Sequence, residues 1–172
     1  FRTLVLIPWA FPMIIVTFTW SYLLNDLYGI VNAKLLHWNL IAQPIQFLAN
    51  PKIAMLTVSL INVWFGVPLF AINILASLQT ISRDLYEAAR IDGANRINCF
   101  FKITVPMLSP TIFLCTVMQF ISSLQVFDTI MAMTQGGPGR ATNVLTYYIY
   151  QRAFVDMRFG YASAVAYVLF VI

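Results

Sequence analysis

Uncharged, largely apolar runs alternate with polar connections along this 172-residue chain. Residues 4–24, 53–78 and 107–127 each supply the roughly 20 apolar positions that a helix needs to cross a bilayer. A fourth run, residues 159–172, has only 14 residues and cannot cross alone. The pattern predicts an all-α, polytopic transmembrane bundle with three complete spans and part of a fourth, and we expect the chain to be an internal fragment of a longer protein.

Prolines interrupt these predicted spans: Pro8 and Pro12 in the first, Pro68 in the second and Pro110 in the third. A proline inside a soluble helix is costly because it removes a backbone hydrogen bond and clashes with the preceding turn. Membrane helices tolerate it where neighbouring helices and Ser or Thr groups satisfy the freed carbonyls. We therefore expect kinked spans.

The composition of the chain is that of a membrane protein. Hydrophobic residues make up 60% of it, charged residues 9%, and the mean hydropathy is +0.81, whereas a soluble domain carries about 25% charged residues. The net charge of +4 is spread over the connections, so no basic patch indicates nucleic-acid binding. His37, beside Trp38, is typical of a membrane interface, and Cys99 and Cys115 lack metal-ligand spacing. We expect no metal site.

The connections between the spans alternate between the two sides of the membrane. Residues 25–52 and 128–158 share one side, and residues 1–3 and 79–106 share the other. Each side carries five Lys or Arg residues, so the positive-inside rule does not orient the chain. Within the first connection, residues 30–50 mix apolar residues with His, Asn and Gln, which is compatible with an interfacial amphipathic helix.

The connection at residues 79–106 carries strong helix signals. Ser82 is a natural N-cap, Asp84 suits the positive start of a helix, and Gly93 suits a left-handed stop. One side of this helix carries residues at helical spacing, two of them small enough to let another backbone approach closely: Leu85, Ala88, Ala89 and Asp92. The residues alone leave open whether this is a docking helix or a solvated connection.

After Gly93, the sequence predicts a second short helix. Asn95 is its cap, the helix runs through residues 96–102, and Pro106 then begins the third span. The predicted order is helix, tight turn, helix, span.

This loop resembles the signature loop of bacterial ATP-binding-cassette importer permeases. The family pattern is Glu-Ala-Ala, three residues, Gly, then a spacer that ends in Ile-x-x-Pro, and its elements are present here as Glu87, Ala88, Ala89, Gly93, Ile103 and Pro106. The resemblance implies a type I importer permease whose cytoplasmic loop, residues 79–106, couples to a separate ATPase dimer. It implies coupling roles for Glu87, Ala88, Ala89, Asp92, Gly93 and Pro106.

A second resemblance lies in Thr134 to Gly139, Thr-Gln-Gly-Gly-Pro-Gly, followed by an aromatic segment from Thr146 and by Phe159-Gly-Tyr-Ala-Ser-Ala. At this distance from the signature loop it is similar to the carbohydrate-importer branch, and to subunits like the larger maltose permease. The resemblance implies a bacterial inner-membrane, multi-pass protein. Its implied partners are a second homologous permease, the ATPase dimer and an extracytoplasmic binding protein that delivers a sugar.

Polar residues within the predicted spans are candidates for a solute pathway. Asn62, Gly66 and Leu69 share one helical face, and their segment resembles the solute-binding span of the maltose permease, which has an aromatic residue where this chain has Leu69. Ser123 and Gln125 are candidates by position in the next span. The alternative is that such residues bond neighbouring helices to one another. The three complete spans contain no Asp, Glu, Lys, Arg or His, which favours a neutral, hydroxyl-rich solute.

Neither a phosphate-binding loop nor a familiar hydrolase motif is present in the sequence, so we identify no catalytic residue and no cofactor on this chain. ATP and Mg²⁺ are expected on the partner ATPase. The sequence therefore predicts a sugar or polyol importer subunit that is not itself an enzyme. The alternatives are a permease for a phosphorylated polyol such as glycerol phosphate, a passive channel or a membrane-embedded enzyme.

Overall fold

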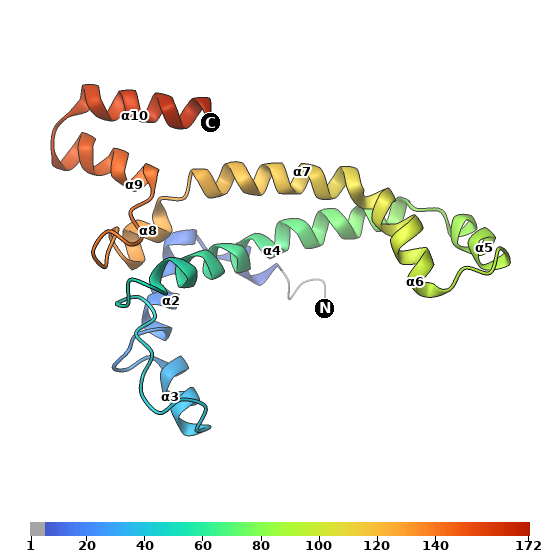
Figure 1. Cartoon of the computed structure of the whole chain (residues 1–172), viewed down its shortest axis with the longest axis horizontal. Helices are drawn as coiled ribbons and strands as arrows, with labels where there is room; N and C mark the ends of the chain where they lie inside the picture. The colour runs from blue at the N-terminus through green and yellow to red at the C-terminus, as the bar shows by residue number, and fades with distance from the viewer. Residues whose placement is uncertain (1–5) are drawn as a thin grey trace.

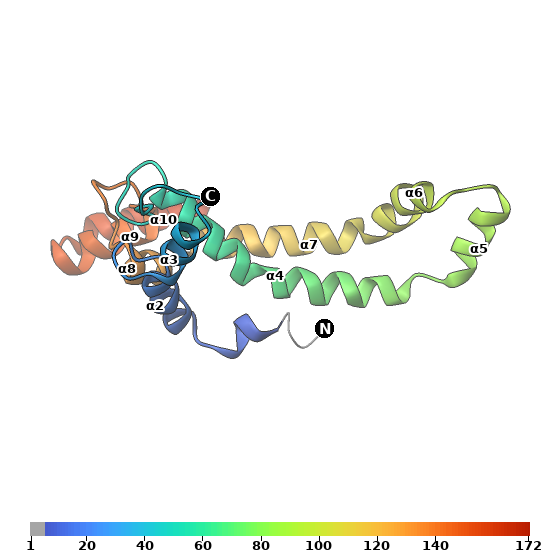
Figure 2. The ribbon, with the colours of Figure 1, turned by 90° about the horizontal axis from the view of Figure 1, so that it is seen from below.

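Two long antiparallel helices, α4 (Ala54–Thr80) and α7 (Val105–Leu124), lie side by side and form the axis of the fold (Figure 1). The computed structural model describes residues 6–172, and that part of the chain has no strand. One end of the pair carries α5 (Arg83–Ile91) and α6 (Arg96–Cys99), and Figure 2 shows the other helices gathered at the opposite end. The predicted all-α fold is confirmed.

Both long helices are apolar enough and long enough to cross a bilayer. α4 has 27 residues, and the continuous helical segment Arg96–Leu124 has 29. At 1.5 Å per residue each extends about 40 Å, more than the roughly 30 Å hydrocarbon core. Two further apolar helices, α2 (Met13–Leu23) and α10 (Phe159–Val171), are shorter.

The run predicted as the first span is not one continuous helix. Its first positions, residues 4 and 5, lie outside the described residues, and a 3-10 helix, η1 (Ile7–Ala10), is separated from α2 by extended backbone at Phe11 and Pro12. Proline explains the break, because Pro12 has no N–H to continue the helix and its ring pushes Phe11 out of the α region. Trp9, in η1, donates its indole N–H to the Phe65 carbonyl of α4 at 3.1 Å, which attaches η1 to that long helix.

The prediction of a separate second helix before the third span was wrong. α6 continues without interruption through a π-helix, η2 (Phe100–Thr104), into α7. Pro106 cannot donate to the Lys102 carbonyl and its ring would clash with that carbonyl, so the chain widens into a π turn there rather than stopping.

Small and polar residues at four-residue spacing form the seam between α4 and α7. Ser77 and Thr111 are hydrogen-bonded through hydroxyls 2.5 Å apart, and Cys115 is buried one turn further along α7. Short side chains let the two backbones approach closely, and hydroxyl pairs between helices add specific bonds in an apolar surrounding. Hydrophobic residues on the outer sides remain exposed in this chain, for example Phe113 at 71%.

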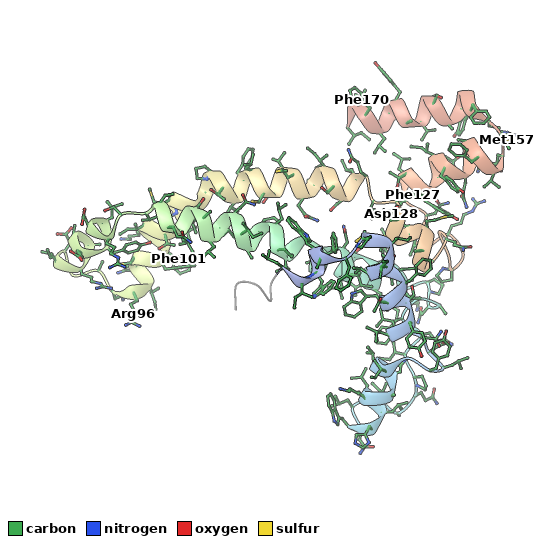
Figure 3. All side chains as sticks on the ribbon, turned by 180° about the vertical axis from the view of Figure 1, so that it is seen from behind. Arg96, Phe101, Phe127, Asp128, Met157 and Phe170 are labelled. Carbon is green, nitrogen blue, oxygen red and sulfur yellow. The ribbon has the colours of Figure 1, made fainter. Side chains whose placement is uncertain are left out.

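The end opposite α5 is held by a small core. Val58 of α4, Ile130 of α8 (Asp128–Met133) and Tyr147 of α9 (Leu145–Tyr150) pack together, and α8 also packs along α2. Figure 3 marks where the chain turns at this end, at Phe127 and Asp128, where α8 begins, and at Met157, between η3 (Gln151–Val155) and α10. This second π-helix, η3, continues α9.

The segment that was compatible with one helix over residues 30–50 contains only α3 (Ile30–His37). Asn39 ends it in a left-handed conformation (φ 53°), and the Leu40 N–H bonds to the Leu35 carbonyl at 3.0 Å. The rest of the connection is fixed by Asn32, which is 2% exposed and makes two 2.9 Å hydrogen bonds to the backbone of Ile45.

Candidate coupling loop and polar helix seam

Helix α5 begins and ends at the predicted residues. The Ser82 hydroxyl accepts the Asp84 N–H at 3.1 Å, which caps the start of the helix. At the other end Gly93 has a φ of +82°, the Ala94 N–H bonds to the Ala89 carbonyl at 2.8 Å, and the Gly93 N–H bonds to the Arg90 carbonyl at 3.0 Å. These two bonds form a Schellman motif, which requires a left-handed residue that glycine provides without strain.

The outer side of α5 is free for a partner. Glu87, Ala88 and Asp92 are exposed, whereas Ala89 is partly buried toward the rest of the loop. Within residues 6–172 the only ion pair joins Arg152 and Asp156, so Glu87 pairs with neither of its basic neighbours on the helix. A carboxylate beside a small alanine side chain could form an ion pair with a basic residue of another protein whose backbone approaches this side of the helix closely.

The second short helix is also capped as predicted. The Asn95 side chain accepts the Asn98 N–H at 2.8 Å, and Arg96 begins α6 at the tip of the loop (Figure 3). Pro106 lies exposed in the first turn of α7, directly after the π-helix η2. The six predicted coupling residues therefore divide into five at the tip, on or directly after α5, and one at the start of the third predicted span.

The candidate solute residues meet across the seam between α4 and α7. Asn62 donates its amide N–H to the Ser123 hydroxyl at 3.4 Å. In this structure of a single chain, the two residues therefore bond α4 to α7, as the alternative interpretation of the polar span residues expects. One turn along, a Cβ built on Gly66 would lie 2.8 Å from Oε1 of Gln119. Gly66 therefore provides the gap that the Gln119 carboxamide occupies.

The other two candidates lie less directly on this seam. Leu69 is partly buried on α4, and its carbonyl accepts the Asn73 amide at 2.7 Å. Gln125 is exposed and directly follows the last residue of α7. Within residues 6–172 it forms no hydrogen bond with Asn62 or Gly66. Gln119 was missed as a site residue although it stands four residues before Ser123, a spacing that places both on the same face of α7.

The Gly-Gly-Pro-Gly segment is a closed loop at the end of the molecule far from α5. Thr142 donates its hydroxyl to the Gly137 carbonyl at 2.6 Å, and its oxygen lies 2.6 Å from the hydroxyl of Thr134. Gly136 (φ +80°) lies against Tyr147, where a Cβ would meet the ring at 2.8 Å. The segment is therefore packed onto the core of that end.

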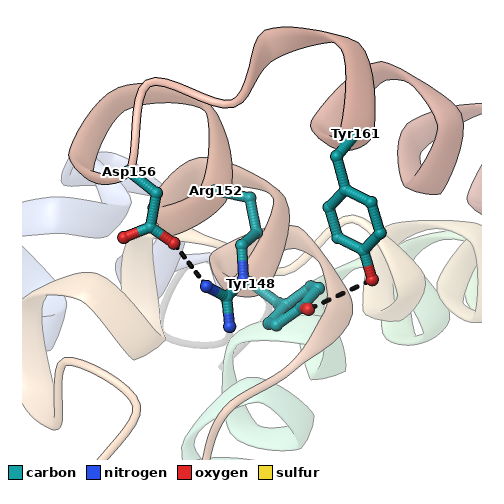
Figure 4. Close-up of polar contacts among 4 residues, drawn as sticks. All are labelled: Tyr148, Arg152, Asp156 and Tyr161. Atoms are coloured by element: carbon teal, nitrogen blue, oxygen red, sulfur yellow. Dashed lines mark hydrogen bonds and ion pairs between the residues drawn. The ribbon is translucent and has the colours of Figure 1, made fainter.

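A cluster that the sequence did not indicate joins α9 to α10 (Figure 4). Arg152 lies over the Tyr148 ring, 4.8 Å from its centroid, and is hydrogen-bonded to Asp156, while the hydroxyls of Tyr148 and Tyr161 are 3.3 Å apart. The hydrogen bond with Tyr161 and the guanidinium of Arg152 both lower the pKa of the Tyr148 phenol. The cluster connects the fourth predicted span to α9.

Comparison with known proteins places this fold in a family. The binding-protein-dependent transport system inner membrane component family matches residues 1–172. The sulfoquinovosyl glycerol transport system permease protein SmoG of Agrobacterium fabrum is 39% identical over 169 residues, which cover 98% of this chain and 54% of that protein. The trehalose/maltose permease MalF of Thermococcus litoralis is 37% identical over 99% of this chain and 57% of its own length. The chain thus spans little more than half of these relatives.

Solved structures show the same architecture. A chain in the crystal structure of a bacterial ABC transporter that imports the acidic polysaccharide alginate superposes with a TM-score of 0.86 at 29% identity, covering 99% of this chain and 61% of that one. A chain of a bacterial alginate ABC transporter in complex with an alginate pentasaccharide-bound periplasmic protein gives a TM-score of 0.85 at 28% identity. A family match over all 172 residues and relatives above 35% identity lead to one conclusion: the chain belongs to the inner-membrane permease components of binding-protein-dependent ABC transport systems.

Proposed function

We propose that this chain forms part of the membrane-spanning subunit of an ATP-driven sugar importer, in which α5 docks on a cytoplasmic ATPase. The observation that carries the proposal is the exposed side of α5. Glu87 is unpaired within residues 6–172, Ala88 is exposed beside it, and Gly93 ends the helix at the tip of a pair of apolar helices about 40 Å long. The pair is long enough to carry movement of the tip across the membrane.

The proposed docking also implies an orientation and a set of partners. Docking of α5 on a cytoplasmic ATPase dimer puts residues 79–106 inside the cell and residues 25–52 and 128–158 outside, where a binding protein would deliver the solute. ATP and Mg²⁺ would bind to the ATPase, because this chain has no phosphate-binding motif. A second homologous permease would cover the exposed apolar sides of α4 and α7 that lipid does not, in a multi-pass protein of the bacterial inner membrane.

The solute is proposed to be a neutral sugar or polyol. The seam offers the amides of Asn62 and Gln119 and the hydroxyl of Ser123, and no charged side chain lies in α4 or α7. Amides and hydroxyls exchange hydrogen bonds with sugar hydroxyls, whereas an anionic solute such as a phosphorylated polyol would lack a cation to pair with in these helices.

Reconstitution of the full-length permease with its partner permease, ATPase and binding protein tests the proposal. We expect the permease to retain the ATPase, to hydrolyse no ATP by itself, and to lose the ATPase when Ala88→Leu fills the low surface of α5; Ala164→Leu, at an exposed alanine of α10, is the matched control. Assays with a panel of neutral sugars and glycerol phosphate would identify the solute. Conduction without an ATPase would show a channel, and turnover of a substrate by the permease alone would show an enzyme.

A further inference from the structure

Helix α5 has little contact with the rest of the protein. Of its nine residues, only Tyr86 and Ala89 are partly buried, and the other seven are exposed. A hollow separates α5 from α6, with a lining that includes Tyr86, Arg90, Asn95, Arg96, Cys99 and Thr104. α5 is therefore not held against α6 by a packed apolar interface.

Tyr86 crosses this hollow to Thr104. The two hydroxyl oxygens are 2.9 Å apart, which is hydrogen-bonding distance. In the part of the chain that the structure describes, this is the one side-chain hydrogen bond between α5 and another helix. Tyrosine is well suited to the role, because its ring is rigid and only the hydroxyl must find a partner.

Thr104 lies at the junction between the π-helix and the third predicted span. It is the last residue of the π-helix η2 and directly precedes α7. In η2 the Val105 N–H bonds to the Phe100 carbonyl, five residues back, and Pro106 removes the next backbone donor. Because π turns have poorer packing than α turns, this is the weak section of the otherwise continuous 29-residue helix. A force applied at α6 must pass through that section, whereas a force applied at Thr104 acts directly at the start of α7.

We propose that Tyr86 is a positioning residue that fixes α5 to the start of α7 through Thr104, so that displacement of α5 by a bound ATPase is passed to α7. This inference rests on the proposed docking of the ATPase on α5. The role given to Tyr86 is one of position and involves no contact with solute or nucleotide. The Tyr86 hydroxyl holds the docking helix in a fixed relation to the helix that lines the polar seam.

Isosteric removal of the two hydroxyls tests the proposal in the reconstituted full-length complex. The variants are Tyr86→Phe, Thr104→Val and their combination, and Thr104→Ser retains the hydroxyl. Thr116→Val is the control, because the Thr116 hydroxyl bonds to the Ile112 carbonyl of its own helix at 2.7 Å. Three quantities are measured: ATPase bound per permease, ATP hydrolysed, and solute transported per ATP.

We expect both single variants to keep the ATPase bound and to lower solute transported per ATP about 2- to 10-fold, the range set by one net hydrogen bond. The double variant should be no worse than Thr104→Val alone, because each single variant already removes the Tyr86–Thr104 bond. Thr104→Val also removes a 3.5 Å bond from the Thr104 hydroxyl to the Cys99 carbonyl, and Thr116→Val controls for the loss of such a bond to the same helical segment. Thr104→Ser and Thr116→Val should match the parent. An unchanged ratio, independent and multiplicative losses, or release of the ATPase by Tyr86→Phe would overturn the proposal. Failure of the proposed function would differ, because the parent permease itself would retain no ATPase.

Discussion

Gly93 offers the sharpest test of the coupling loop, because a side chain at this position would raise the free energy of the turn only through backbone conformation and not through a clash. Its φ is +82°, and a Cβ at this position would meet no atom within 4 Å. Gly93→Ala therefore introduces no clash and leaves only the left-handed penalty, about 1–2 kcal/mol. α5 has nine residues and little packing, so its turn has no large reserve of stability to absorb this cost.

The penalty converts into a change in binding that can be measured. If the ATPase binds only the loop with its Schellman turn formed, about 1–2 kcal/mol weakens the apparent affinity by up to roughly 5- to 30-fold. Titration of the ATPase onto detergent-solubilised full-length permease measures this. Gly93→Asn should recover most of the affinity, because asparagine tolerates left-handed backbone.

The chain supplies a matched control at the other end of the molecule. Gly139 also has a left-handed φ, +54°, and also has open space around its Cβ position. Gly139→Ala should carry a similar local strain and leave the ATPase affinity unchanged. Equal affinity of Gly93→Ala and the parent protein, or equal losses at both glycines, would refute the reasoning that the turn of α5 sets docking.

Two further predictions concern the outer end and the seam. Asn32→Ala leaves the partly buried N–H and C=O of Ile45 without their Asn32 partners and should lower the free energy of unfolding by about 1–3 kcal/mol, seen as a reduced thermal midpoint. The Gln43→Ala variant, at an exposed residue, should leave the midpoint unchanged, and an equal effect of both variants would contradict the role given to Asn32. Gly66→Ala places a Cβ 2.8 Å from the Gln119 amide oxygen and should reduce solute transport while ATPase binding persists. Gln119→Asn in the same protein keeps the amide on a shorter side chain and should restore part of that transport. Equal transport by Gly66→Ala with and without Gln119→Asn would show that the contact with Gln119 is not the cause of the loss.

Local signals accounted for what the sequence predicted well. The N-caps Ser82 and Asn95 and the left-handed Gly93 each depend on neighbouring residues alone, and all three are where the sequence puts them. The apolar runs likewise predicted α4 within one residue at its start and two at its end. Such features follow from the chemistry of a few consecutive positions.

The errors arose where distant or competing effects decide the structure. The first apolar run was predicted as one span kinked by its prolines, whereas extended backbone at Phe11 and Pro12 separates η1 from α2. Trp9 of η1 bonds to Phe65 of α4. Pro106 was expected to separate two helices, whereas the helix widens into η2 before Pro106 and continues into α7. A proline in the sequence indicates that the helix is interrupted, but it does not say whether the interruption is a break, as at Pro12, or a π turn, as before Pro106.

Contacts between side chains on different helices could not be predicted from the pattern of residues along the chain. Asn62 and Gly66 were singled out, but their partners on α7 depend on the register of two helices joined by the whole of residues 81–104. Tyr86 stands next to the residues that carried the family resemblance and was passed over, because its function lies in reaching Thr104, 18 positions away. If that bond transmits movement, the register of α7 against α4 is the quantity that docking alters, and the pairs Asn62–Ser123 and Gly66–Gln119 are the first contacts such a shift would change. The coupling loop and the solute seam would then be two ends of one mechanical element.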